Sequence, residues 1–392
     1  MTARQAQILV VDDNEDNRDM LARRLRRMGH AVVEAENGRV ALERLRQQPF
    51  DLVLLDIMMP EVNGFQVLEQ VHQVPEWRHI PVVVISALDD MDSVVRCVEL
   101  GAEDYLFKPF NAVLLNARVA ACLDKKWLRD QEQAHLAALR QEMELGRQIQ
   151  ADFMPMELPT LPGWEIAARF HPAYEVAGDF YDVFRLPGNR LGLLLGDVSG
   201  KGVGAALFMA LTRSLLRAFA DRARTDDALP FTDADILDAV RLTNRYILRH
   251  HQQRTNMFAT LFMGVLEVTS GQLSYVNAGH VPPLLARAAA GCESLEPTGP
   301  LVGVTEDIPF RVHDTHLNPG DSLLIYTDGV TEAMNARHEL LGTERLMTVL
   351  DRPPTSADNL LDRIEAMVRA HSGTASLSDD LTLLALRRTQ ED

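Results

Sequence analysis

Residues 52–60 read Leu52-Val53-Leu54-Leu55-Asp56-Ile57-Met58-Met59-Pro60. An apolar run of this kind is typical of a strand buried on both faces, and here it ends in an aspartate. Residues 8–11 repeat the pattern and end in Asp12 and Asp13, and a third apolar run at 81–85 ends at Ser86. Strands buried on both faces occur in parallel sheets, so such a sheet is predicted for the first part of the chain.

Helical and strand patterns alternate through the first 121 residues. Strands are expected at 8–11, 31–34, 51–55, 81–85 and 104–107, and helices at 18–28, 40–47 and 92–100. This alternation predicts an α/β domain at residues 1–121, a doubly wound five-stranded parallel sheet with helices on both faces. Ligands of such sheets bind at the carboxyl ends of the strands, where Asp12, Asp13, Asp56 and Lys108 are expected.

This group of side chains suits phosphoryl chemistry. Three carboxylates repel one another unless a cation shares the site, and Mg²⁺ binds carboxylate and phosphate oxygens. Lys108 would bring a compact positive charge to a phosphoryl group, and Ser86 could donate a hydrogen bond to it. The alternative is that Asp12 or Asp13 only caps the next helix, because aspartate is a common N-cap residue.

The motifs of this half resemble those of response-regulator receiver domains. The resemblance covers residues 8–121 and rests on Asp12-Asp13, on 54–60 followed by Gly64, on Ser86-Ala87 and on 105–109. It implies that Asp56 accepts a phosphoryl group from a sensor histidine kinase. It implies a receiver Mg²⁺ held by Asp13, Asp56 and the Met58 carbonyl, with Asp12 in support. It also implies that Ser86 and Tyr105 form a switch pair, with Lys108 beside the phosphoryl group and a cis Lys108–Pro109 bond.

Residues 111–150 contain no proline and one glycine, Gly146, and they are rich in helix-forming residues. A helical linker is therefore predicted at residues 122–153. Its leucines follow a loose heptad, which favours a dimeric coiled coil and hence a homodimer. The alternative is a lone solvated helix between two domains.

The remaining residues, 154–392, contain many short strand patterns separated by turn signals, with few helices. Strands are expected at 191–195, 260–268, 273–277, 322–326 and 381–386, and helices at 205–220 and 236–249. This mixture predicts an α+β sandwich flanked by helices. This part of the chain contains four separated aspartates, Asp179, Asp197, Asp328 and Asp379. Three of them lie next to an expected strand, and three adjoin a glycine. Aspartates without cysteine or histidine suit Mg²⁺ or Mn²⁺, and two such ions can activate water against a phosphoryl group.

Taken in order, these blocks resemble the SpoIIE-like branch of the type 2C, metal-dependent serine/threonine phosphatases. The blocks are 176–182, 196–202, 278–284, 326–329 and 378–382, and the resemblance covers about 155–388. It implies two Mn²⁺ or Mg²⁺ ions. Asp197 would bridge both ions, Asp179 and the Val198 carbonyl would hold one, and Asp328 and Asp379 would hold the other. The implied substrate is a phosphorylated anti-sigma-factor antagonist or a similar regulator.

One position departs from better-studied type 2C enzymes, which carry a phosphate-binding arginine four residues before the first aspartate. That position is Glu175 here, so phosphate capture is assigned to the metals and, as a hypothesis, to Lys201, with Arg169 as an alternative. Only four of the 39 basic residues are lysines, which draws attention to Lys201. His280 is either a catalytic acid or, in the preferred interpretation, a histidine that satisfies a turn.

The composition excludes several classes of protein. The 392 residues carry a formal charge of -17, which argues against binding nucleic acid through bulk electrostatics. Three widely spaced cysteines predict neither a disulfide framework nor a zinc cluster. No apolar signal core and no apolar stretch of about 20 residues is found, so a soluble, cytoplasmic protein without membrane contact is expected.

The sequence therefore predicts a two-component response regulator whose phosphorylation at Asp56 controls a phosphatase at residues 154–392. The alternative is that the second domain is a catalytically dead module that sequesters a partner. Loss of metal-binding aspartates would indicate that alternative, and all four are present.

Overall fold

The computed structural model describes residues 4–87, 91–109, 111–222, 232–251, 256–289, 291–373 and 377–390. The chain divides into two compact units, Met1–Leu139 and Arg140–Asp392. Each unit has its own sheets and its own hydrophobic core, and each is described by itself.

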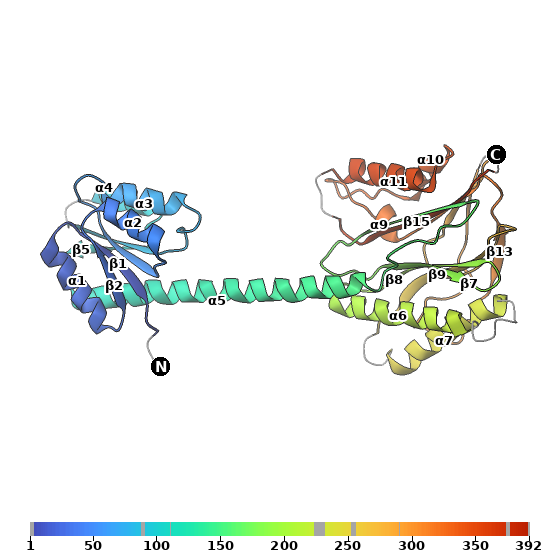
Figure 1. Ribbon diagram of the computed structural model, residues 1–392, viewed down its shortest axis with the longest axis horizontal. Coiled ribbons are helices and arrows are strands. Elements are labelled where there is room, and N and C mark those ends of the chain that lie inside the picture. Colours follow the sequence, from blue (N-terminus) through green and yellow to red (C-terminus); the bar gives the residue numbers. More distant parts are fainter. Residues whose placement is uncertain are drawn as a thin grey trace. The chain divides into compact units, whose positions relative to one another are not determined.

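The first unit is built on one parallel sheet of five strands in the order β2-β1-β3-β4-β5 (Figure 1). The strands are β1 (Gln7–Val11), β2 (Ala31–Ala35), β3 (Leu52–Asp56), β4 (Val82–Ala87) and β5 (Asp104–Lys108). The direction of the strand order reverses between β1 and β3, which is where ligands of such sheets bind. The predicted doubly wound parallel sheet is confirmed.

Helices cover both faces of this sheet. They are α1 (Glu15–Arg27), α2 (Gly38–Gln47), α3 (Gly64–Gln73), α4 (Met91–Glu99) and α5 (Ala112–Ala151). Leu9, Val53 and Val84 point to the face that α2, α3 and α4 cover, while Ile8, Leu54 and neighbouring residues point to α1 and the first turns of α5. Successive side chains of a strand face opposite ways, and both faces of this sheet are covered by helices. The strands are therefore apolar at successive positions and do not alternate between apolar and polar residues. The sequence prediction did not assign α3.

The second unit contains two antiparallel sheets, as predicted for a sandwich. One sheet has the order β13-β10-β9-β8-β7 and the other β12-β11-β14-β15-β6. The strands of the first are β7 (Phe180–Leu186), β8 (Arg190–Val198), β9 (Ala259–Glu267), β10 (Gln272–Ala278) and β13 (His313–His316). Those of the second are β6 (Trp164–His171), β11 (Leu284–Ala286), β12 (Cys292–Ser294), β14 (Ser322–Tyr326) and β15 (Leu381–Arg388).

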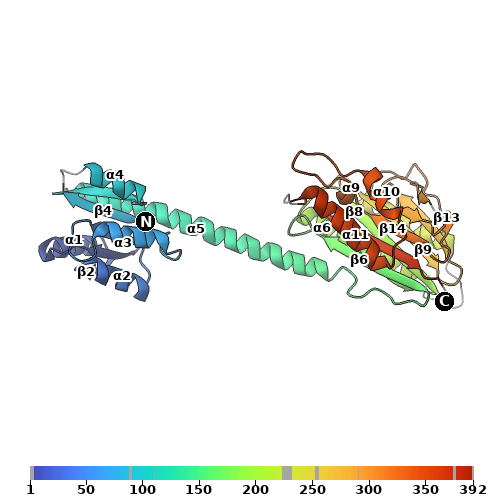
Figure 2. The ribbon, with the colours of Figure 1, turned by 90° about the horizontal axis from the view of Figure 1, so that it is seen from above.

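These sheets pack face to face and carry helices on their outer faces. Leu191, Leu193 and Leu195 of β8 meet Leu384 and Leu386 of β15 in the central core, and the alternate residues of both strands face outward. The outer face of the first sheet is covered by α6 (Val203–Arg222) and α7 (Asp233–His250). The second is covered by α9 (Asp328–Thr331), α10 (Thr343–Leu350) and α11 (Ala357–Ser372), and α11 lies along β6 and β15 (Figure 2).

Helix α6 contains a long apolar segment. Residues Val203–Ala220 are long and apolar enough to cross a membrane by length and composition alone. Arg213 and Arg217 lie within this segment. In the structure, Phe208, Met209 and other side chains of α6 are buried in the core of the second unit.

Arg213 and Arg217 of α6 are held by one buried carboxylate. Asp182 of β7 is almost fully buried, and its Oδ2 lies 2.8 Å from a guanidinium nitrogen of Arg213 and 3.0 Å from one of Arg217. We expect Asp182→Ala to lower the free energy of unfolding by about 3 kcal/mol, because it leaves the largely buried Arg213 without its carboxylate. Urea unfolding measures this. Asp362→Ala, at a 64% exposed ion-paired carboxylate, is the control and should cost under about 1 kcal/mol.

Candidate functional site

The carboxyl ends of β1 and β3 bring three aspartates of the first unit together. One carboxylate oxygen from each of Asp12, Asp13 and Asp56 lies within 4.8 Å of the others. Asp12 and Asp56 are buried and Asp13 is exposed, so the cluster opens to solvent on one side. Three converging carboxylates are a donor set that fits a small hard cation such as Mg²⁺.

Lys108, at the end of β5, completes this cluster. Its Nζ donates to Asp12 Oδ2 at 2.9 Å and to Asp56 Oδ2 at 2.6 Å. Burial raises the pKa of Asp56 above its usual range, although the hydrogen bond from Lys108 opposes this rise. The structure therefore places one fixed positive charge directly on the predicted phosphoacceptor.

A backbone contact and the strand register place the other predicted receiver residues. The backbone N–H of Met58 donates to Asp56 Oδ1 at 3.3 Å. Ser86 is buried at the end of β4, and the register pairs Val84 with Tyr105 and Ser86 with Phe107. Because paired residues of neighbouring strands point the same way, Ser86 and Tyr105 lie on one face of the sheet. The expected cis Lys108–Pro109 bond is confirmed.

In the second unit, Asp179 is oriented by two threonines from distant parts of the chain. Its Oδ2 accepts hydrogen bonds from Thr327 Oγ1 at 2.7 Å and from Thr382 Oγ1 at 2.6 Å, and all three residues are buried. Thr327 immediately precedes Asp328, and Thr382 follows Asp379 by three residues. The Asp179 carboxylate therefore connects three of the four blocks that carry the predicted metal-binding aspartates.

Close backbone approaches bring the blocks into one place. A Cβ at Gly178 would lie 2.9 Å from the Val198 carbonyl oxygen and 3.6 Å from Asp197 Oδ1. A Cβ at Gly329 would overlap the Asp380 carbonyl oxygen. These glycines allow the Asp179 block to lie against the Asp197 block and the Asp328 block against the Asp379 block.

Burial and repulsion between carboxylates raise the pKa values of Asp179, Asp197 and Asp328. Burial, followed by the neighbouring Asp197, raises the pKa of Asp179 well above its usual range. Burial, together with Asp328 and Asp379, raises the pKa of Asp197 to about 7. The set contains oxygen donors only, which fits Mn²⁺ or Mg²⁺. Among the described residues, only the receiver triad brings three such oxygens within 4.8 Å of one another, so the second set is more widely spread.

Lys201 lies at the edge of this second group. Its Nζ is 3.0 Å from Asp379 Oδ2 and donates to the Ser378 carbonyl at 2.7 Å. The same ammonium group sits over the ring of Tyr174, 5.3 Å from its centroid. About half of its side chain is exposed, so Lys201 is accessible from solvent while it contacts a predicted metal ligand.

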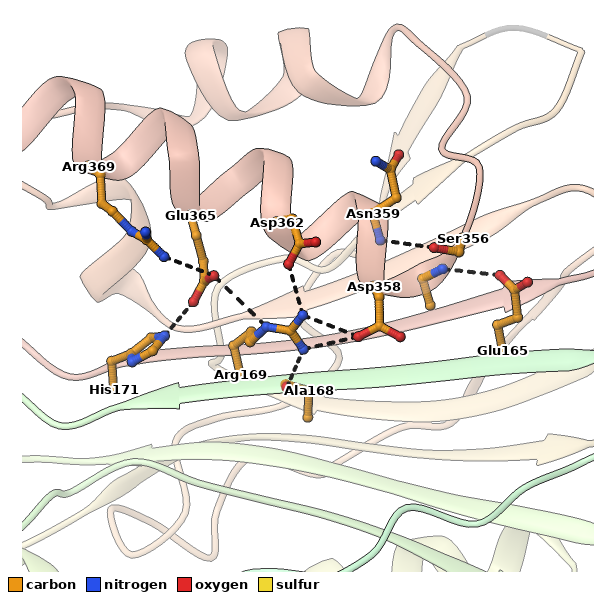
Figure 3. Close-up of polar contacts among 11 residues, drawn as sticks. Glu165, Ala168, Arg169, His171, Ser356, Asp358, Asn359, Asp362, Glu365 and Arg369 are labelled. Atoms are coloured by element: carbon orange, nitrogen blue, oxygen red, sulfur yellow. Dashed lines mark hydrogen bonds and ion pairs between the residues drawn. The ribbon is translucent and has the colours of Figure 1, made fainter.

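The structure decides between the alternatives for His280 and Arg169. His280 is fully buried, its Nε2 contacts the Tyr326 carbonyl at 3.0 Å and its Nδ1 contacts Thr260 Oγ1 at 2.9 Å. Burial lowers its pKa to about 4, so both ring nitrogens serve a neutral structural histidine. The sequence left Arg169 as the alternative phosphate ligand. Its guanidinium is engaged by carboxylates of α11 instead (Figure 3), namely Asp358, Asp362 and Glu365.

Several residues at this site were missed by the sequence analysis. Asp380 accepts from the backbone N–H of Ala173 through Oδ1 and from that of Gly178 through Oδ2, both at 2.8 Å. Thr327 and Thr382 orient Asp179, as described above. The only signal for Asp380 was its place in the quoted block 378–382, in which Asp379 alone was given a role.

Comparisons with known proteins agree with this division of the chain. The family model "Stage II sporulation protein E (SpoIIE)" matches residues 187–389, and "Response regulator receiver domain" matches residues 8–120. Protein IcfG of Synechocystis sp. is 40% identical over 265 residues, 64% of this chain, and the chain spans only 42% of the length of that relative. Phosphoserine phosphatase RsbU of Bacillus subtilis is 25% identical over 252 residues, 64% of this chain and 71% of RsbU. The SiaA-PP2C domain of Pseudomonas aeruginosa shares the fold, with a TM-score of 0.54 and 21% identity over 65% of this chain and 98% of that domain.

Proposed function

Because the chain belongs to the SpoIIE family and carries a response regulator receiver domain, we propose that phosphorylation at Asp56 controls a metal-dependent protein serine/threonine phosphatase in the second unit. The observation that carries this proposal is the orientation of Asp179 by Thr327 and Thr382, which gathers oxygen ligands from distant blocks. The name of the relative RsbU supports a phosphoserine substrate.

In the receiver, Asp56 accepts the phosphoryl group from a sensor histidine kinase. Asp13, Asp56 and the Met58 carbonyl would hold Mg²⁺, and Asp12 would support them. The Nζ of Lys108 lies 2.6 Å from Asp56 Oδ2, and it would contact the phosphoryl oxygens once Asp56 is phosphorylated. Ser86 moves toward the oxygens of the phosphoryl group. Tyr105, which lies on the same face of the sheet, then rotates. Phosphorylation then shifts the population of two receiver states and does not create a new fold.

In the second unit, Asp197 would be a ligand shared by two cations. Asp179 and the Val198 carbonyl would hold one, and Asp328 and Asp379 would hold the other. Bound Mn²⁺ or Mg²⁺ supplies water activation and neutralises charge on the phosphoryl group. The protein's own part is to fix the carboxylates: the threonine hydroxyls hold Asp179, and Asp380 holds the backbone in front of it.

The substrate we propose is a phosphorylated serine or threonine on an anti-sigma-factor antagonist or a similar regulator. The protein would act in the cytoplasm as a homodimer through the helical linker, proposed at residues 122–153, without binding nucleic acid or membrane. The test is phosphate release from such a phosphoprotein with Mn²⁺. A full-length protein that releases no phosphate with or without phosphorylation of Asp56 would refute the enzymatic part of the proposal.

We further propose that Lys201 attracts the substrate phosphate from its half-exposed position beside Asp379. Lys201→Ala is expected to raise KM for the phosphoprotein about tenfold, as about 1.4 kcal/mol of charge-assisted hydrogen bonding is lost. Steady-state kinetics at saturating Mn²⁺ measures this. Lys125→Ala, at an exposed lysine paired with Glu103 in the receiver, is the control. An unchanged KM in Lys201→Ala would remove this role.

Asp380 is proposed to position the segment that carries Asp179. Asp380→Asn replaces one of its two accepting oxygens by a donor, so either Ala173 or Gly178 loses its partner. We expect a loss of about 10- to 100-fold in activity at limiting Mn²⁺. Initial rates across a Mn²⁺ titration measure it, with the exposed Asp358→Asn as control. Identical titration curves for Asp380→Asn and wild type would contradict the assignment.

A further inference from the structure

Tyr174 is a half-exposed aromatic residue in the connection between β6 and β7, five residues before Asp179. Its ring lies beneath the ammonium group of Lys201, whose Nζ is 5.3 Å from the ring centroid. An ammonium group within about 6 Å of an aromatic face is attracted by the negative face of the ring. The two side chains therefore form a cation–π pair.

The backbone around Tyr174 is held by a single carboxylate. The N–H of Ala173, directly before Tyr174, donates to Asp380 Oδ1 at 2.8 Å, and the N–H of Gly178 donates to Asp380 Oδ2 at 2.8 Å. Each of these bonds has a charged acceptor, which makes it stronger than a bond between neutral groups. The loop that presents the Tyr174 ring is thus anchored on both sides of that residue.

The same short segment also holds Lys201. Its Nζ donates to the Ser378 carbonyl at 2.7 Å and lies 3.0 Å from Asp379 Oδ2. Within the part of the chain that the structure describes, these two oxygens are its acceptors, so one of its three N–H donors remains for a ligand. Residues 378–380 therefore fix both members of the cation–π pair.

The pair places a positive charge beside two of the predicted metal ligands. Lys201 contacts Asp379 directly. Burial raises the pKa of Asp328, and the nearby charge of Lys201 opposes that rise. A lysine ammonium is a compact charge on a flexible stem, and about half of this side chain is exposed. The ring of Tyr174 covers one side of the ammonium group and limits the directions that it can take.

This restriction matters because the chain has no arginine at the position that better-studied type 2C enzymes use for phosphate. That position is Glu175, an exposed residue whose carboxylate repels a phosphoryl group. An arginine presents a planar fork of donors that is already organised for phosphate, whereas a lysine has no such fork. A lysine that replaces it gains from a neighbour that fixes its head, and Tyr174 is placed to do so.

We propose that Tyr174 is a positioning residue, which holds the Lys201 ammonium at the edge of the predicted metal site for binding the phosphoryl oxygens of the substrate. The inference rests on the proposed function, because it takes Lys201 to attract the substrate phosphate. It adds the residue that prepares Lys201 for that task. Tyr174 acts through Lys201 and touches neither metal nor phosphate.

Two variants of full-length protein separate the ring from the hydroxyl. Tyr174→Leu removes the aromatic face and keeps an apolar side chain, while Tyr174→Phe keeps the ring and loses only the hydroxyl. The protein is labelled with ¹³C at the lysine Cε atoms, and only four lysines contribute signals. Lys201→Arg identifies the signal of Lys201. Inorganic phosphate is titrated in the presence of Mg²⁺, and the Lys201 signal gives the Kd.

The Lys201 Hε signals should be shifted upfield by the ring in wild type and in Tyr174→Phe, and this shift should be lost in Tyr174→Leu. The signals of Lys125 and Lys126, which lie in the first unit, should stay the same. The Kd for phosphate should rise about two- to fivefold in Tyr174→Leu and return to the wild-type value in Tyr174→Phe. An unchanged Kd in Tyr174→Leu would overturn the proposal, and so would an equal loss in Tyr174→Phe.

A double variant tests whether Tyr174 acts through Lys201. The readout is the inhibition constant of inorganic phosphate against hydrolysis of para-nitrophenyl phosphate at saturating Mn²⁺. Tyr174→Leu should raise this constant in wild type, with little change in kcat, and should have no further effect in Lys201→Ala. An equal rise in both backgrounds would show that Tyr174 contacts phosphate itself, which contradicts the positioning role. If Tyr174→Leu does not fold, Tyr174→Gln also removes the ring and takes its place.

Failure of the proposed function would look different. A protein that hydrolyses no phosphate ester, yet binds phosphate more weakly at Lys201 in Tyr174→Leu, would refute the enzyme and retain the positioning role. A working phosphatase with the same inhibition constant in wild type and Tyr174→Leu would refute the positioning role and retain the enzyme.

Discussion

Asp197→Asn is expected to lower kcat/KM for a phosphoprotein by about 10³-fold or more, equivalent to at least about 4 kcal/mol of transition-state stabilisation. The residue is the last but one of β8 and lies beside Gly178, and burial together with Asp328 and Asp379 raises its pKa to about 7. A carboxyl under that much repulsion is suited to share cations, and asparagine cannot supply the bridging charge. Phosphate release at saturating Mn²⁺ measures the loss.

Two comparisons make this prediction specific. Asp362→Asn alters an exposed aspartate of the same unit that pairs with Arg169, and its activity should stay within about twofold of wild type. The Mn²⁺ affinity of Asp197→Asn should fall together with its activity. Full Mn²⁺-dependent activity in Asp197→Asn would show that the metal assignment is wrong.

Asp56→Asn is expected to abolish the response to a phosphodonor such as acetyl phosphate. The ratio of phosphatase rates with and without the donor should fall to one, because the amide cannot form the acyl phosphate that Lys108 and Ser86 would contact. The basal phosphatase rate is measured in the same experiment. The expected result is loss of regulation in a protein that still hydrolyses its substrate.

The control for Asp56 lies in the same region of the receiver. Asp16→Asn changes an exposed aspartate in the first turn of α1, and its response to the donor should be that of wild type. A phosphodonor response that persists in Asp56→Asn would place the phosphoacceptor elsewhere and would contradict the receiver assignment.

The receiver cluster could be predicted from the sequence because of the geometry of parallel sheets. The carboxyl ends of the strands meet at one edge, so residues that directly follow apolar runs must converge. Asp12, Asp56 and Lys108 followed such runs, and the structure brings them within hydrogen-bonding distance. No knowledge of register between distant strands was needed.

The arrangement of the second unit could be predicted less fully from the sequence, because its sheets are not parallel. Its sheets are antiparallel and its connections are long, so the partner of a given strand is not readable from an apolar pattern. The motifs identified Asp179 and Asp197 but not the threonines and Asp380 that orient them. Hydrogen bonds from side chains to a loop backbone, such as that of Gln150 to Ala177, follow no periodicity in sequence.

The two predicted sites, one in the receiver and one in the second unit, explain part of the formal charge of -17. Seven of the predicted site residues are aspartates, gathered at two places, and burial raises the pKa of four of them, namely Asp56, Asp179, Asp197 and Asp328. Bound cations would offset part of this charge in the working protein. The acidity that first argued against nucleic acid therefore also reflects the predicted phosphoryl chemistry.

The most direct test of the account is phosphate release from a phosphorylated anti-sigma-factor antagonist by the full-length protein. The assay contains Mn²⁺ and compares protein phosphorylated at Asp56 with unphosphorylated protein. The account predicts Mn²⁺-dependent release at a rate that changes with phosphorylation of Asp56. The same rate in both states would contradict control by the receiver, and no release in either state would contradict the phosphatase itself.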